Sequence, residues 1–261
     1  MAQKRAGKLY IGTSGWMYKD WGKTFYPKDM KKGFLTFLAT EFDTVEVNSS
    51  FYHLPLASTF KKWCEETPKG FVLAVKMSRY ITHVLQLRSA SGPLNRFLSR
   101  AKHLASKLGP VLVQLPPFLK YDDAVLRSFL KNIKSAAKKQ KMRVRWALEP
   151  RNSSWMLKEN ASAIRELLKK EKNVSLVFPH SSKIPSFEPT AENIVSDFVY
   201  VRFHGPSEFA ASRYGARRLA PWARRIGAWR AKVLDVFAYF NNDVHGHAVH
   251  DARTLKKLLG S

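Results

Sequence analysis

The chain has 261 residues, 45% of them hydrophobic, which is enough for one full-sized core, and its one cysteine, Cys64, excludes a disulfide framework. No stretch is apolar over the length of a membrane span or a signal peptide, so we expect a soluble, cytoplasmic protein with no membrane partner. The formal net charge of +25 predicts attraction to polyanions, above all nucleic acid, unless the balance only reflects habitat.

Eight short β-rich runs recur along the chain, and helical apolar spacing fills most intervals between them. The runs are residues 9 to 13, 44 to 48, 71 to 75, 111 to 115, 144 to 149, 174 to 178, 198 to 203 and 236 to 241. One helix-like segment ends in Gly109 before Pro110. The next begins at Asp122 or Asp123 as its N-cap. Only the interval between the sixth and seventh runs lacks a clear helical pattern.

Apolar strands that alternate with helices favour a parallel sheet covered on both faces, and eight such units favour closure into a barrel. The sequence therefore predicts an α/β fold, a TIM-barrel-like closed parallel (β/α)8 barrel. It forms a single domain over residues 9 to 261, after a flexible N-terminus at 1 to 8. A doubly wound open sheet is the alternative. Residues 12 to 16, GTSGW, have the glycines of a dinucleotide-binding loop but not its spacing or following helix.

Polar and aromatic residues gather where the runs end, at the edge that carries the active site of a parallel barrel. We expect substrate contacts there from Ser14, Trp16, Tyr18, Trp21, Asn48, Tyr52, Lys76, His83, Gln114, Arg151, Trp155, Arg202, Asn241 and Asn242. Three pairs of residues two positions apart share a strand face: Glu46 with Asn48, Glu149 with Arg151, and Arg202 with His204.

The first functional hypothesis is a hydrolase or lyase acting on a phosphate-bearing or polyanionic substrate, such as nucleic acid. Its general base is one of three carboxylates, those of Glu46, Glu149 and Asp243. His204 would act as the acid. Phosphate would be held by Lys76, Arg151 and Arg202. A mixed His and carboxylate set can also hold a divalent metal, but no motif such as H-E-x-x-H is present, and the cofactor stays unknown.

Two other classes of protein remain open. A glycoside-type hydrolase would use Glu46 and Glu149 as paired carboxylates, about 5 to 10 Å apart beneath a tryptophan-lined mouth that binds a small molecule. A non-catalytic barrel would bind nucleic acid through backbone charge and aromatic stacking.

Two basic segments bear on nucleic-acid binding. Residues 131 to 146 are typical of a solvated helix face. Residues 209 to 234 interleave arginines with aromatic residues that could stack on bases, namely Tyr214, Trp222 and Trp229.

Purely structural roles are the competing interpretation of the same residues. Glu149 with Arg151 or Arg202 can form an ion-pair network that only closes the barrel end. His83 and His204 can be core imidazoles, and tryptophans such as Trp155 can be packed lids.

The chain resembles the YecE-like proteins, the family called domain of unknown function 72, over residues 9 to 259. The resemblance rests on seven motifs in order: GTSGWMYKDWGKTFYP, FDTVEVNSSFYHLP, KMSRYITH, LGPVLVQLPP, LEPRNSSW, YVRFHG and FNNDVHGHAVHDA. It implies a TIM-barrel-like fold but no established activity. Two departures from the family pattern are His180, where the family tends to have Asp, and Asp251, where it tends to have Asn.

Overall fold

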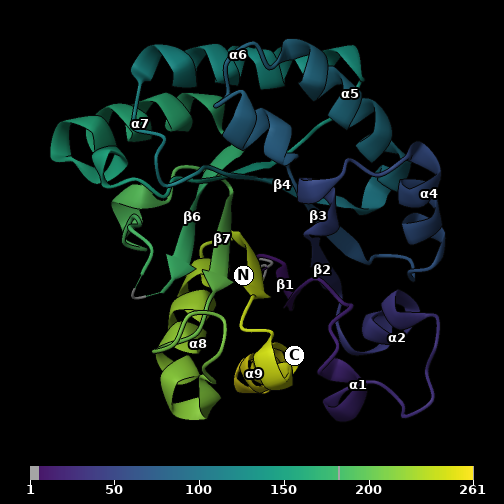
Figure 1. Ribbon diagram of the computed structural model, residues 1–261. Coiled ribbons are helices and arrows are strands. Elements are labelled where there is room, and N and C mark those ends of the chain that lie inside the picture. The colour runs from purple at the N-terminus through teal and green to yellow at the C-terminus, as the bar shows by residue number, and fades with distance from the viewer. Residues whose placement is uncertain (1–5, 182, 261) are drawn as a thin grey trace, which may run out of the picture.

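Eight parallel strands close into a barrel in sequence order, and β8 pairs with β1. Figure 1 shows strands at the centre of the molecule with helices around them. The computed structural model describes residues 6 to 181 and 183 to 260. The strands are β1 (Leu9–Ser14), β2 (Thr44–Val47), β3 (Val72–Lys76), β4 (Leu108–Gln114), β5 (Trp146–Glu149), β6 (Val174–His180), β7 (Phe198–Phe203) and β8 (Asp235–Phe240). The predicted single-domain TIM-barrel-like fold is therefore confirmed, and the open doubly wound sheet is excluded.

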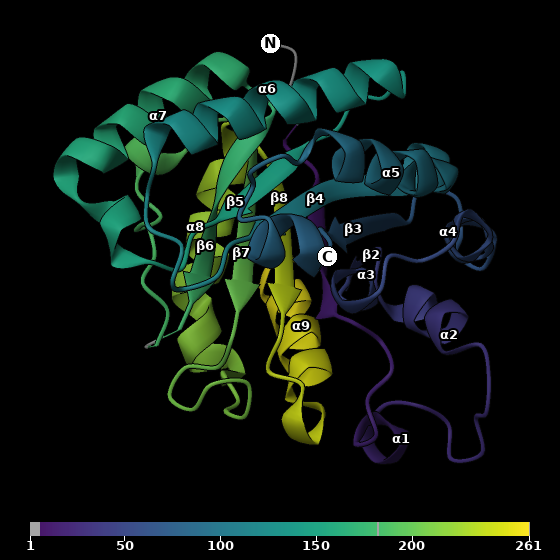
Figure 2. The ribbon, with the colours of Figure 1, turned by 45° about the horizontal axis from the view of Figure 1, so that its top comes forward.

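Helices surround this barrel, with α6 and α7 on its outer surface (Figure 2). The α-helices are α1 (Trp21–Thr24), α2 (Phe34–Glu41), α3 (Ser49–Tyr52), α4 (Ala57–Glu65), α5 (Ser91–Ala101), α6 (Asp123–Lys139), α7 (Lys158–Glu171), α8 (Gly215–Ala231) and α9 (His247–Leu258). One short π-helix is η1 (Tyr80–Val84). The short 3-10 helices are η2 (Lys102–Lys107), η3 (Ser153–Met156), η4 (Ala191–Asn193) and η5 (Val244–Gly246). Among the described residues between β6 and β7 the only helical segment is η4, in agreement with the absence of a clear helical pattern there.

Local sequence explains where α6 begins and what it buries. The carboxylate of Asp122 accepts a hydrogen bond from the backbone N–H of Val125 at 3.1 Å, which makes Asp122 the N-cap. Leu126, Phe129 and Ile133 then follow at helical spacing and are buried against the strands.

The barrel interior changes from apolar to charged along its axis. Near the N-terminal strand ends, the rings of Tyr10 and Phe237 stack with centroids 4.7 Å apart. Above them, Tyr200 and Tyr239 are fully buried, and the hydroxyl of Tyr239 lies 2.7 Å from that of Thr44. At the C-terminal strand ends the interior residues are charged, so the apolar part forms a solid floor beneath the polar mouth.

The start of the chain is fixed to the barrel from Gly7 onward. The backbone of Gly7 exchanges hydrogen bonds with Arg230, and the N–H of Lys8 donates to Asp235 at 2.8 Å. Of the predicted flexible N-terminus, residues 1 to 5 lie outside the described residues. Within the described ranges, no helix combines the length and apolar character that crossing a bilayer requires.

Candidate active site at the barrel mouth

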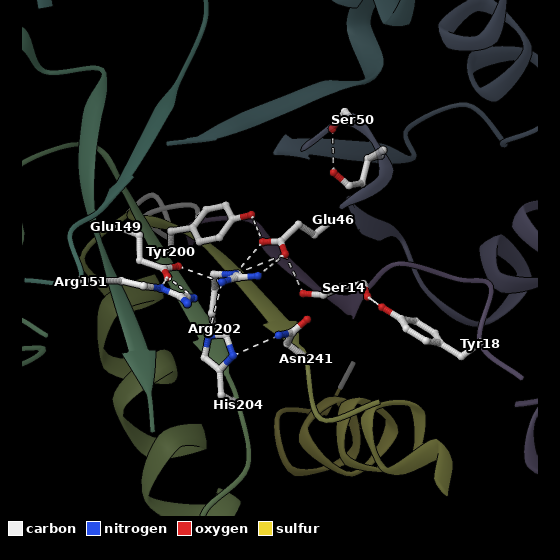
Figure 3. Close-up of polar contacts among 11 residues, drawn as sticks. Ser14, Tyr18, Glu46, Ser50, Glu149, Arg151, Tyr200, Arg202, His204 and Asn241 are labelled. Atoms are coloured by element: carbon white, nitrogen blue, oxygen red, sulfur yellow. Dashed lines mark hydrogen bonds and ion pairs between the residues drawn. The ribbon is translucent and has the colours of Figure 1, made fainter. Parts of the chain in front are cut away.

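A buried arginine joins two glutamates across the mouth of the barrel (Figure 3). The guanidinium of Arg202 on β7 donates to Glu46 on β2 at 2.8 and 3.0 Å. Its Nη1 donates to Glu149 on β5 at 2.9 Å. All three side chains are nearly inaccessible to solvent. The guanidinium thus fills the space between the two carboxylates.

Glu46 and Glu149 also accept hydrogen bonds from residues other than Arg202. Ser14 and Tyr200 donate their hydroxyls to Glu46, each at 2.7 Å. Arg151 donates to Glu149 from Nε at 2.7 Å. Each carboxylate therefore accepts at least two charge-assisted or hydroxyl hydrogen bonds, which fix its orientation.

The charges of the network stabilise one another. Burial alone would raise the pKa of Glu149, but the neighbouring Arg151 and Arg202 outweigh it and hold that pKa at about 2. Burial likewise disfavours the charged form of Arg202, yet Glu46 and Glu149 raise the pKa of its guanidinium. The two arginines therefore keep Glu149 anionic near neutral pH, and its role as a general base stays a prediction.

His204 is held in its neutral form. Burial first, and then the adjacent Arg202, hold the pKa of its imidazole well below the usual value. Nη1 of Arg202 lies 3.3 Å from Nε2, and the tautomer of the ring decides which of its two nitrogens accepts a hydrogen bond. Nδ1 faces the side-chain amide of Asn241 at 3.1 Å. The lowered pKa disfavours a charged imidazole at neutral pH, and the role of His204 as the acid stays a prediction.

Asp243 is the carboxylate of the mouth that is poised to exchange a proton. Burial raises the pKa of this carboxyl to about 7, although a hydrogen bond with Tyr18 partly opposes the shift. Its Oδ1 is buried without a hydrogen-bond partner among the described residues, as is the amide oxygen of Asn48. The indole of Trp21 donates to the backbone carbonyl of Asp243 at 3.3 Å and positions the turn after β8.

Lys76 brings a second titratable group to the mouth. Burial, and then the nearby Arg202, lower the pKa of its ammonium to about 7. Nζ lies 4.1 Å from the centroid of the Phe51 ring, and no ion pair or hydrogen bond of Nζ is found within the described ranges. Beside it, His83 bonds to the hydroxyl of Thr82 at 2.8 Å. Burial and then Lys76 lower the pKa of His83 to about 4.

A hollow of about 290 Å³ opens next to this network. Its walls include Arg151, Lys183 and the partly exposed ring of Phe209, from the loops after β5, β6 and β7. Phe209 stacks on His204 with a 9° angle between rings and so connects the hollow to the mouth. Two cations and one aromatic face therefore meet a solvent-accessible space.

Several other residues that were expected to contact substrate instead contact the protein itself. Trp21 and Trp155 are buried, and the indole of Trp155 donates to the carbonyl of Leu119 at 2.9 Å. The amide of Gln114 donates to the backbone of Leu115 at 3.0 Å. Trp16 packs edge-on against Trp63, 5.4 Å between centroids. These side chains close the top of the core.

Two further predicted contacts lie apart from the network. Tyr52 is exposed on α3. Asn242 is buried and donates to Asp251 at 2.9 Å.

The aromatic residues of the basic segment 209 to 234 do not form a stacking surface. All three are buried: Tyr214 and Trp222 pack against Phe203 of β7, and Trp229 packs against Phe178 of β6. This corrects the expectation that they stack on bases.

Both departures from the family pattern have structural contacts. Nδ1 of His180 lies 2.7 Å from the hydroxyl of Tyr214. Asp251 accepts the backbone N–H groups of Tyr214 and Gly215, at 2.9 and 3.0 Å, at the start of α8. Asp251 therefore anchors that helix end.

Sequence reasoning missed Tyr200, Lys183 and Phe209. Tyr200 could have been found, because it stands two residues before Arg202 on β7 and so shares its inward face. Lys183 and Phe209 lie in loops, where no periodicity predicts direction.

The described residues of the mouth do not include a cluster of metal ligands. Within residues 6 to 181 and 183 to 260, no three His, Cys, Asp or Glu side chains converge as metal ligands. Both glutamates are instead committed to Arg202.

The fold and mouth define a TIM-barrel protein whose strand ends carry a buried ionic network. The chain belongs to the family described as "Protein of unknown function DUF72", which matches residues 10 to 261. It is 27% identical over 276 residues to the UPF0759 protein YunF of Bacillus subtilis, covering 96% of this chain and 94% of that protein.

Solved structures of two family members have the same fold. A DUF72 family protein of Enterococcus faecalis superimposes with a TM-score of 0.80 at 20% identity, covering 97% of this chain and 96% of that one. One from Thermotoga maritima gives 0.78 at 24% identity, covering 97% and 100%.

Proposed function

We propose that the barrel mouth is the active site of an enzyme that acts on a small phosphate-bearing substrate by proton transfer, as a hydrolase or lyase. The observation that carries this proposal is the buried carboxyl of Asp243, whose pKa of about 7 lets it donate or accept a proton at neutral pH. Its Oδ1 is buried and makes no hydrogen bond within the described residues, so this oxygen is not committed to a protein partner.

Binding of the anion is assigned to the hollow beside the mouth. Arg151 keeps part of its guanidinium exposed there while Glu149 fixes its orientation, and Lys183 adds a second positive charge. The ring of Phe209 offers a stacking face for a base or other planar group. A volume of about 290 Å³ suits a small phosphate ester.

The Glu46–Arg202–Glu149 network is the rigid support of this site. Because the guanidinium lies between the two carboxylates, no water or sugar can stand between them as glycoside cleavage requires. This geometry disfavours the glycoside-type alternative.

The test is turnover of a panel of nucleoside monophosphates, sugar phosphates and nitrophenyl phosphate esters by the full chain. Asp243→Asn should lower kcat by at least about 100-fold and leave KM unchanged or lower, since a like charge is removed from near the anion. Arg151→Met should instead raise KM. The matched control is Asp29→Asn, an exposed carboxylate that should behave as the wild type. Turnover that survives in Asp243→Asn would overturn the proposal.

A further inference from the structure

A hollow of about 1130 Å³ lies at the opposite end of the barrel from the mouth. It is bounded by the C-terminal ends of α6 and α7, the segments before β5 and β7, and the first residues of β4. We call it the basal groove. Six of its lining side chains are basic and one, Asp197, is acidic; the basic ones are Lys134, Lys138, Arg143, Arg145, Lys169 and Lys172.

Four of these cations have no anionic partner among the residues that the structure describes. Arg145 is neutralised by Asp197 and Asp235, and Lys134 lies 3.5 Å from Glu171. The other four basic side chains of the groove are exposed, and within the described ranges they make no ion pair or hydrogen bond: Lys138, Arg143, Lys169 and Lys172. The groove therefore concentrates uncompensated positive charge.

Helix dipoles explain only part of this cluster. A lysine in the last turn of a helix offsets its negative end, which accounts for Lys138 on α6 and Lys169 on α7. Lys172 is the C-cap of α7 and has the same explanation, but Arg143 lies between α6 and β5, so that reason does not extend to it.

We infer that the basal groove binds single-stranded nucleic acid, with the four unpaired cations on the phosphate backbone. Tyr10, half-buried and stacked on Phe237, lies in the groove and offers a ring to a base. A flexible single strand can follow a concave surface and turn a base inward, whereas the bases of a duplex are already paired and stacked. An anionic membrane fits less well, because no large exposed apolar side chain lines the groove to enter a bilayer.

The test measures binding of fluorescein-labelled oligo(dT) and oligo(U), about 20 nucleotides long, by anisotropy over a salt series. The groove variant combines Lys138→Ala, Arg143→Ala, Lys169→Ala and Lys172→Ala. The matched control removes four exposed arginines of α8 by Arg217→Ala, Arg218→Ala, Arg224→Ala and Arg225→Ala. Both variants carry a formal net charge of +21, four less than the natural +25.

We expect the groove variant to bind at least about tenfold more weakly than the control, with a salt slope smaller by up to about 3, since each phosphate contact on a single strand contributes about 0.7. Equal losses in both variants would show a generic charge effect and overturn the inference. Preference for duplex DNA or for phosphatidylserine vesicles would also overturn it. Circular dichroism checks that both variants fold. Asp243→Asn should bind oligonucleotide as the wild type does. The binding result therefore tests the basal groove even if the proposed enzymatic activity is absent.

Discussion

At the scale of single residues, the mouth separates groups with fixed charge from groups that titrate near neutrality. Glu149 and Arg202 hold each other ionised, whereas Asp243 and Lys76 have opposite ordinary charges but pKa values that converge at about 7. Environments that move pKa values toward neutral pH are frequent at functional sites.

Substituting Lys76 by Met should stabilise the protein, most strongly at low pH. The folded pKa of Lys76 is about 7 against 10.5 ordinarily, so its burial costs stability fully below pH 7 and the cost vanishes as pH rises toward 10.5. The change in pKa sets an upper limit of about 5 kcal/mol. Urea unfolding of both proteins between pH 6 and 10 measures the difference. A gain that does not shrink with rising pH would contradict the assignment.

Glu149→Gln should destabilise the fold by about 3 to 5 kcal/mol, because Arg202 and Arg151 lose a buried counterion. The folded pKa of Glu149 is depressed to about 2, so its contribution is complete above its ordinary pKa of 4.5 and is lost as pH falls toward 2. Denaturant unfolding at pH 7 and pH 3 measures both effects. Glu166→Gln, an exposed carboxylate on α7, is the control and should change little.

At the scale of elements, loops and helix ends depend on single buried polar groups. Asp251 of α9 accepts two backbone N–H groups at the start of α8 and the amide of Asn242. It thereby ties the last two helices and the turn after β8 together.

Asp251→Ala should lower the free energy of unfolding by about 1 to 3 kcal/mol, since buried donors lose their acceptor. Asp251→Asn keeps one acceptor oxygen and should cost less. Thermal and urea unfolding measure both. A loss in Asp251→Asn as large as in Asp251→Ala would show that charge, not hydrogen bonding, is what α8 requires.

The elements themselves were predictable, because apolar runs and turn residues act locally. All eight strands lie within about three residues of their expected starts. Gly109 is an exception: it belongs to β4, where its missing Cβ admits the side chain of Val72 at close range. The meeting of Glu46 with Arg202 and the burial of Trp222 depend on tertiary packing, which periodicity alone does not determine.

At the scale of the whole molecule, repulsion among like charges opposes compaction. The chain carries 45 basic and 20 acidic side chains, and most of the ion pairs found in its described ranges are surface pairs that contribute little each.

Raising NaCl from about 0.02 to 0.5 M should therefore raise the melting temperature, since screening of net repulsion outweighs the weakening of surface pairs. Differential scanning calorimetry measures the change. Sodium chloride and potassium chloride should act alike if screening is the cause. A constant or falling melting temperature would show that attractive pairs dominate.

The aromatic floor inside the barrel insulates its two ends from each other. Tyr200, Tyr239 and Phe237 are buried inside the barrel, and the ring of Tyr200 lies 6.2 Å from that of Phe237 and 5.2 Å from that of Tyr239, so packed side chains separate the two ends. Each end can therefore change its chemistry in evolution, or by engineering, without retuning the other, so one domain can hold two independently adjustable surfaces.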